Sequence, residues 1–167
     1  GMNLVAKEYI ATKHDNQGGV IPSKRDNDGC YDLYVCIEDD IVIKPHQIRL
    51  IPTGICSTFS NKYRLAIRER GSNTKSGLIT VAGQIDSNYT GEWFLALYNS
   101  NEIPVCITHT VEDVVSTDET IFVPTKKAQA QFAVEFVPIV QIEEVELDYI
   151  KNLKTDRGEG KIGSSGK

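Results

Sequence analysis

The chain has 167 residues, of which 40% are hydrophobic and 25% charged, the composition of one globular domain with a real core. Its net charge of −5 argues against a nucleic-acid partner, because phosphate backbones need a basic surface. No apolar run reaches the length of a membrane helix, so we expect no membrane partner. Cys36, Cys56 and Cys106 stand among apolar residues and are expected to be buried thiols, which predicts a cytoplasmic protein.

Short apolar runs follow one another along the chain, with turn residues between them. We expect strands at residues 3–12, 29–35, 41–43, 47–55, 63–68, 77–81, 93–98, 105–111, 121–123 and 128–137, and a short helix at 145–153. Many short strands separated by turns predict an all-β barrel or sandwich for residues 1–153. From Lys154 the chain is rich in glycine and serine, so residues 154–167 are predicted to form a flexible C-terminal arm.

The segment 83–91 reads Gly-Gln-Ile-Asp-Ser-Asn-Tyr-Thr-Gly and lies between two predicted strands. Its glycines and its Asp-Ser-Asn run predict a hairpin or a tight corner. Asp86 and Tyr89 stand three residues apart in this turn. A carboxylate on a loop beside a rigid scaffold is a place for a general base, whereas the alternative is that Asp86 serves only the turn.

Two polar segments, residues 70–77 and the glycine-rich C-terminus, have the chemistry of anion cradles. Each combines glycine, which lets backbone N–H groups approach a phosphate, with hydroxyl and arginine donors. The alternatives are a solvated loop for the first segment and a disordered terminus for the second. Asp32 begins a strand and is either a turn cap or an indirect metal contact, and Gln131 is either a site residue or merely faces solvent.

Five segments in this order resemble the motifs of the trimeric dUTPase family. They are residues 29–33, 70–72, 82–91, 130–131, and 157–160 with 163–166. The second has the Glu-Arg-Gly-Ser form that some bacterial and phage-type members carry. The resemblance implies an all-β, jelly-roll-like (β-clip) homotrimer with a flexible C-terminal arm and active sites shared between subunits. It also implies that dUTP is hydrolysed to dUMP and pyrophosphate, which limits uracil in DNA and supplies dUMP for thymidylate synthesis.

The resemblance also implies roles for individual residues. Asp86 would activate the water that attacks the α-phosphorus, and Tyr89 would pack on the deoxyribose and so exclude UTP. Main-chain groups around residues 80–85 would read uracil. Asp32 would contact Mg²⁺ through a water molecule. The remaining substrate-binding residues implied in this way are Arg70, Gly71, Ser72, Thr80, Gly83, Ile85, Gln131, Arg157, Ile162, Gly163, Ser164 and Ser165.

The chain departs from the family pattern at three places. Ile162 stands where many members have a phenylalanine that stacks on uracil. Ala128 stands where the fourth motif often has arginine, which leaves one phosphate-side cation either missing or supplied by Lys126, Lys127 or Lys75. The segment 112–125 is longer than in compact members.

Two other functions fit parts of the pattern. A dCTP deaminase of the same fold needs a glutamate on the strand after the hairpin, where this chain has Ala96 unless a shifted alignment brings Glu92 to that position. A non-catalytic nucleotide-sensing module would also use the fold. The retained Asp86 and the complete C-terminal motif argue against a module that has lost catalysis.

Overall fold

The structure is a computed structural model, and it describes residues 5–8 and 18–161. The chain divides into two units, of which the first ends at Val137 and the second begins at Pro138. The last strand ends at Phe136. The domain boundary expected at residue 153 stays a prediction.

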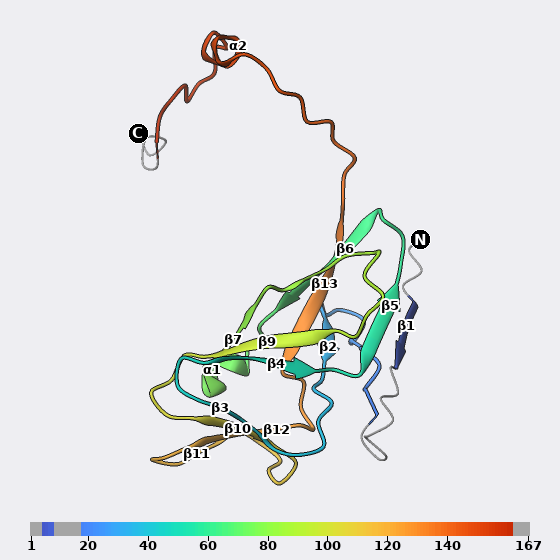
Figure 1. Ribbon diagram of the computed structural model, residues 1–167, viewed down its shortest axis with the longest axis vertical. Coiled ribbons are helices and arrows are strands. Elements are labelled where there is room, and N and C mark those ends of the chain that lie inside the picture. Colours follow the sequence, from blue (N-terminus) through green and yellow to red (C-terminus); the bar gives the residue numbers. More distant parts are fainter. Residues whose placement is uncertain (1–4, 9–17, 162–167) are drawn as a thin grey trace. The chain divides into compact units, whose positions relative to one another are not determined.

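The first unit is built almost entirely of short strands, which confirms the all-β prediction (Figure 1). The four sheets have the strand orders β1-β5, β11-β12-β10-β3, β2-β13-β6-β8 and β4-β9-β7. The strands are β1 (Val5–Glu8), β2 (Tyr31–Leu33), β3 (Ile41–Ile43), β4 (Ile48–Pro52), β5 (Ile55–Thr58), β6 (Tyr63–Arg68), β7 (Leu78–Val81), β8 (Gln84–Ile85), β9 (Phe94–Asn99), β10 (Val105–Thr108), β11 (Val115–Ser116), β12 (Ile121–Pro124) and β13 (Ala130–Phe136).

Two short helices complete the described structure. Helix α1 (Asn73–Ser76) is a single turn inside the segment expected to be a polar loop, and it ends at Gly77, whose φ of 69° suits a residue without a Cβ. In the second unit, α2 (Leu147–Lys151) confirms the helix predicted near residues 145–153. No helix among the described residues has the length and apolarity needed to cross a lipid bilayer.

Large apolar side chains from all four sheets form one core. Trp93 and Phe132 are fully buried and meet edge to face, with ring centroids 5.4 Å apart. The indole Nε1 of Trp93 donates a hydrogen bond to Ser57 Oγ at 3.1 Å, so its one polar atom is satisfied. Cys36 and Cys106 are buried as predicted, but Cys56 is only partly buried because it lies on the outer side of β5.

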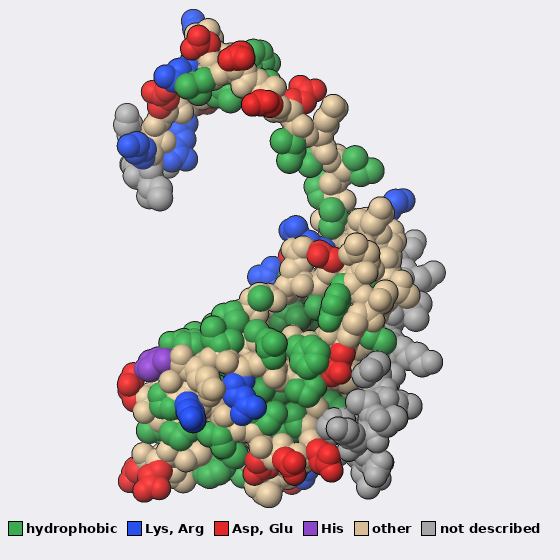
Figure 2. Space-filling view, in the orientation of Figure 1, with side chains coloured by type: hydrophobic (Ala, Val, Ile, Leu, Met, Phe, Trp, Pro, Cys, Tyr) green, Lys and Arg blue, Asp and Glu red, His purple; other side chains and the backbone are tan. Residues whose placement is uncertain are grey.

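One face of the β4-β9-β7 sheet carries apolar side chains that remain exposed. The register sets Tyr98 of β9 opposite both Ile48 of β4 and Ile79 of β7, so these side chains share one face. Ile48, Leu50, Ile79 and Phe94 are 55%, 67%, 42% and 45% exposed. Figure 2 shows hydrophobic side chains gathered over the strand body. A continuous apolar sheet face of this kind marks a surface for association.

Candidate active site

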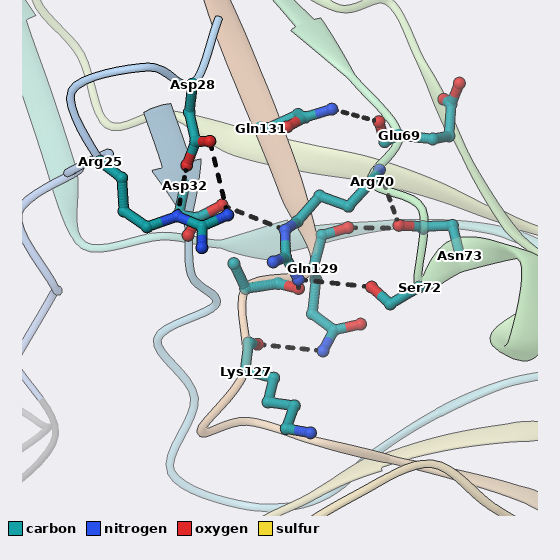
Figure 3. Close-up of polar contacts among 11 residues, drawn as sticks. Arg25, Asp28, Asp32, Glu69, Arg70, Ser72, Asn73, Lys127, Gln129 and Gln131 are labelled. Carbon is teal, nitrogen blue, oxygen red and sulfur yellow. Dashed lines mark hydrogen bonds and ion pairs between the residues drawn. The ribbon is translucent and has the colours of Figure 1, made fainter. Parts of the chain in front are cut away.

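The β2-β13-β6 sheet brings two predicted site residues into register. Gln131 of β13 lies opposite Asp32 of β2 on one side and opposite Arg68 of β6 on the other. Gln131 Nε2 donates to the main-chain oxygen of Glu69 at 2.9 Å, just beyond the end of β6. Arg70 then meets Asp32 in an ion pair, with Nε and Oδ1 3.1 Å apart (Figure 3). Strand pairing therefore places residues from three distant segments together.

The backbone around Arg70 is fixed by Asn73, the first residue of α1. Asn73 is buried, its Oδ1 accepts from the Arg70 N–H at 3.0 Å, and its Nδ2 donates to the Leu78 carbonyl at 2.9 Å. The Arg70 Nη1 donates to the Ala128 carbonyl at 3.1 Å and to Ser72 Oγ at 3.3 Å. Asn73 thus anchors this segment, a role that a polar residue in a polar run does not reveal in the sequence.

Four of the predicted site residues line an open cavity of about 710 Å³. Asp32, Arg70, Gly71 and Gln131 form one part of its wall. Residues of the segment 23–30 form the rest, and of these the sequence had pointed only to Gly29 and Cys30. A volume in this range is typical of a small-molecule site. Polar side chains and an arginine fork in the wall suit an anionic ligand.

The segment 83–91 forms a corner rather than a simple hairpin. Strands β7 and β9 pair with each other, but the connection between them contains β8, which pairs instead with β6. The Gly83 carbonyl accepts from the Ile67 N–H at 2.6 Å. A Cβ at position 83 would lie 2.7 Å from the Ile67 oxygen, so the close approach to β6 requires glycine.

Asp86 follows β8 directly and is exposed in a cleft. Gln84 Nε2 donates to Asp86 Oδ1 at 2.7 Å, which orients the carboxylate. Tyr89 donates its hydroxyl hydrogen to the Glu92 carbonyl at 2.6 Å, and its ring covers Gly91 so closely that a Cβ there would lie 2.8 Å from the hydroxyl oxygen. The cleft, of about 280 Å³, is lined by Gln84, Ile85, Asp86, Tyr89 and Phe94.

The carboxylate of Glu69 holds Thr80, a role that the sequence did not predict. Glu69 Oε2 accepts from the Thr80 N–H at 2.8 Å and also from the Thr80 hydroxyl. The hydrogen bond from the Thr80 side chain is the main cause that lowers the pKa of Glu69. Because its main-chain oxygen also accepts from Gln131, Glu69 joins the base of the corner to the Arg70 segment.

The structure places seven of the predicted residues in two groups, whereas Ser72, Thr80 and Gly83 line neither cavity. Asp32, Arg70, Gly71 and Gln131 share the larger cavity, while Ile85, Asp86 and Tyr89 share the smaller cleft, and the two linings have no residue in common. Asp86 also borders a second cleft, with Tyr63, Arg64 and Val137.

Comparison with known proteins identifies the family. A family model described as dUTPase matches residues 16–112. The deoxyuridine 5′-triphosphate nucleotidohydrolase of Nautilia profundicola is 33% identical over 163 residues, which cover 95% of this chain and 99% of that protein. The corresponding enzyme of Glaesserella parasuis is 31% identical, covering 81% of this chain and 80% of its own length.

The chain belongs to the dUTPase family.

Solved dUTPase structures share its fold. The dUTPase of Staphylococcus bacteriophage 80alpha with dUpNHpp has a TM-score of 0.74 at 19% identity, covering 99% of both chains. A variant of the dUTPase from phage phi11 of S. aureus, described with a structural Mg(II) ion, has a TM-score of 0.67 at 16% identity and covers 86% of this chain and 97% of its own. The jelly-roll-like architecture expected from the sequence is thereby confirmed.

The C-terminal dUTPase motif lies in the second unit. Arg157 Nε donates to the Gly160 carbonyl at 2.7 Å, and Gly158 between them has a φ of 57°. Residues 157–160 therefore form a tight local turn. Ile162, Gly163, Ser164 and Ser165 lie outside the described residues. Their roles stay predictions.

The cations considered for the missing arginine of the fourth dUTPase motif lie elsewhere. Lys126 pairs with Glu112 and Lys127 pairs with Asp113, both from the long segment 112–125. That segment also supplies β11, which pairs with β12 at the edge of its sheet and which the sequence did not predict. Neither of these lysines lines the cavity of Arg70, and nor does Lys75, the third candidate.

The position at which a dCTP deaminase needs a glutamate holds a residue that cannot transfer a proton. Ala96 is buried in β9, opposite Leu50 and Val81. Glu92, which a shifted alignment would bring forward, uses its Oε2 to accept from the Gly54 N–H at 3.1 Å. Its carboxylate therefore holds the β4–β5 turn.

A pH-dependent contribution to stability follows from Glu69. The pKa of Glu69 is lower in the folded state than in the unfolded chain. Its hydrogen bonds with Thr80 therefore contribute their full stabilisation above the ordinary glutamate pKa of about 4.3. That stabilisation is lost as the pH falls through the lower pKa of the folded state. We expect the difference in urea-unfolding free energy between the wild type and Glu69→Gln to be constant from about pH 8 to 5 and to shrink at more acidic pH. Glu119→Gln, at an exposed turn, is the control. A difference that does not vary with pH would contradict the assignment.

Proposed function

We propose that this dUTPase hydrolyses dUTP to dUMP and pyrophosphate in a Mg²⁺-dependent reaction, as a homotrimer with shared active sites. Its physiological role would be to limit uracil in DNA and to supply dUMP for thymidylate synthesis. The observation that carries the proposal is the exposed, oriented carboxylate of Asp86 in one cleft with Tyr89. A general base needs a free oxygen at a fixed place beside its substrate.

Asp86 is the proposed base. Gln84 occupies Oδ1, so Oδ2 is available to accept a proton from water. The water oxygen forms a bond to the α-phosphorus as the bond from that phosphorus to the bridging oxygen breaks, and pyrophosphate leaves in line. The proton stays on Asp86 until it passes to solvent, which the exposure of the side chain permits.

The corner around residues 80–85 is the proposed uracil site. Its main chain is held on one side by the contact of Gly83 with Ile67 and on the other by Glu69 and Thr80. Fixed backbone donors and acceptors can read one base and reject others by shape. The Tyr89 ring, anchored through its hydroxyl, is proposed to pack on the deoxyribose, where a ribose 2′-hydroxyl would collide.

The larger cavity is the proposed phosphate site, with Arg70, Gly71 and Gln131 of its wall as donors. Ser72, which accepts a hydrogen bond from Arg70, is proposed to add its hydroxyl. Within the described ranges, no group of three or more His, Cys, Asp or Glu side chains could hold a metal by itself. The residues nevertheless fit Mg²⁺ bound mainly by phosphate oxygens and water, because Mg²⁺ typically uses only one or two carboxylates. Asp32 would hold it through water, and the bound ion would neutralise charge on the triphosphate.

Shared sites are supported by the separation of the two groups of residues. Asp86 and Arg70 line different cavities of one chain, and we propose that a second copy brings them to one nucleotide. The exposed face of Ile48, Leu50 and Ile79 supplies apolar surface for that association. Arg157, Ile162, Gly163, Ser164 and Ser165 are proposed to close over the bound phosphates and exclude water.

Pyrophosphate release from dUTP, dCTP, dTTP and UTP, measured in parallel with Mg²⁺, tests the reaction. We expect release from dUTP alone, because the corner fixes the base and Tyr89 fixes the sugar. The products are checked for base identity. Loss of the amino group from dCTP would replace the proposal with a deaminase, and binding of dUTP without turnover would replace it with a nucleotide sensor.

The variant Asp86→Asn tests the base. We expect kcat to fall by roughly two to four orders of magnitude while dUpNHpp binding changes little, because the amide keeps the shape but cannot accept the proton. Asp118→Asn, an exposed carboxylate of the β11–β12 turn, should keep wild-type turnover. If Asp86→Asn retains more than about a tenth of the wild-type kcat, Asp86 is not the base.

Mixed assemblies test whether sites are shared. Asp86→Asn and Arg70→Gln chains are each expected to be nearly inactive. After they are unfolded and refolded together in equal amounts, about a quarter of the sites would combine an intact Asp86 with an intact Arg70 from a neighbour. Activity should rise accordingly. Arg70→Gln mixed with Gln131→Ala, two changes in the same cavity, should show no gain. An equally flat result for the first mixture would place each site within one chain.

A further inference from the structure

The wall of the larger cavity opposite Arg70 is a closed loop of the chain. Ser23 and Asp32 form an antiparallel bridge, and the Asp32 N–H donates to the Ser23 carbonyl at 2.8 Å. At the tip of the loop, the Asp28 N–H donates to the Arg25 carbonyl at 3.0 Å. These two bonds fix the main chain from which Lys24 and Arg25 project. The same bridge holds Asp32, so the loop and the ion pair of Asp32 with Arg70 share one support.

The two cations of this loop are used differently. Lys24 Nζ donates to the carbonyls of Arg25 and Asp26 at 3.2 and 3.1 Å and lies 5.7 Å from the ring centre of Tyr31. Its ammonium group therefore holds the loop together. The Arg25 side chain is 89% exposed. Its Nε and Nη2 donate to the carboxylate of Asp28 at 3.0 and 3.4 Å.

Asp28 positions the Arg25 guanidinium but does not use all of its hydrogen-bond donors. A guanidinium has five N–H donors in a planar fork, so the two contacts with Asp28 leave donors for a phosphate oxygen. In Figure 3 the Arg25–Asp28 pair lies beside Asp32, on the side of the cavity facing Arg70. The hydrogen bond from Arg25 is the main cause that lowers the pKa of Asp28, so this carboxylate stays ionised and keeps its partner oriented.

The charges of the wall show why a second guanidinium matters. The cavity is lined by the cations Lys24, Arg25 and Arg70 and by the carboxylates Asp28 and Asp32. Lys24 is occupied by main-chain carbonyls, and Arg70 by Asp32 and Ala128. Ala128 offers no charge, and Lys127 pairs with Asp113 outside this wall. Without Arg25 the positive and negative side chains of the wall would cancel, which suits a polyanion poorly.

We propose that Arg25, held by Asp28, is a phosphate-binding residue of this enzyme and supplies the cation that position 128 lacks. The inference rests on the proposed function, because its ligand is the triphosphate chain of dUTP. Arg25 binds the chain from the loop side of the cavity while Arg70 binds it from the α1 side. It is a binding and positioning residue, and the proton transfer remains with Asp86.

Binding of dUpNHpp and of dUMP, both with Mg²⁺, is measured by calorimetry for wild type, Arg25→Gln and Lys127→Gln, with Lys44→Gln as a control for surface charge. We expect Arg25→Gln to weaken dUpNHpp binding about tenfold, the scale of a charge-assisted hydrogen bond, and to leave dUMP binding within about twofold. Lys127→Gln and Lys44→Gln should bind both ligands as the wild type does. Arg25→Lys should recover part of the loss, since it restores charge but not the fork.

Steady-state kinetics with dUTP separates this inference from the reaction itself. If wild type hydrolyses dUTP and Arg25→Gln raises KM much more than it lowers kcat, the assignment stands. If wild type hydrolyses dUTP but Arg25→Gln binds dUpNHpp normally, or if Lys127→Gln causes the loss instead, the assignment is overturned while the proposed function survives. If wild type does not hydrolyse dUTP, the proposed function fails first and the inference with it.

Discussion

The candidate site depends on the pairing of β13 with β2 on one side and with β6 on the other. This register sets Gln131 beside Asp32 and Arg68, and it sets the next residue, Phe132, into the core against Trp93. A slip of one residue would turn Phe132 to the cavity and Gln131 into the core. The free energy of burying Phe132 therefore fixes the place of the polar residues, although none of it comes from the site.

The cations that line the larger cavity are all held by carboxylates or carbonyls. Arg70 pairs with Asp32 and Arg25 with Asp28, while Lys24 donates to the main-chain carbonyls of Arg25 and Asp26. Exposed pairs of this kind contribute little to stability, because solvent screens them and ordering two long side chains costs entropy. Their value lies in orientation. Each pair holds its cation in one place before a ligand arrives, which lowers the entropy that binding must overcome.

The sequence predicted the strands better than the contacts between them. Alternation and turn residues indicate a strand wherever one face is buried, as in β6, and local motifs put Asp86 and Arg70 forward as candidate site residues. Strand partners are long-range, so the pairing of β8 with β6, which makes the corner at Gly83, left no local pattern. Asn73 and Glu69 act through distant hydrogen bonds, and polar residues in a polar run give no sign of that. Arg25 was missed because the cavity wall it belongs to exists only once Ser23 bridges Asp32.

The division of site residues between two separate cavities has a consequence for how activity depends on expression. On the proposed assembly a single chain carries both halves of a site but cannot join them. Where chains are scarce and assembly is incomplete, turnover would then vary with a power of chain concentration greater than one. A modest change in gene dosage would shift dUTP hydrolysis more than proportionally, and a catalytically dead chain would impair the sites of its wild-type neighbours.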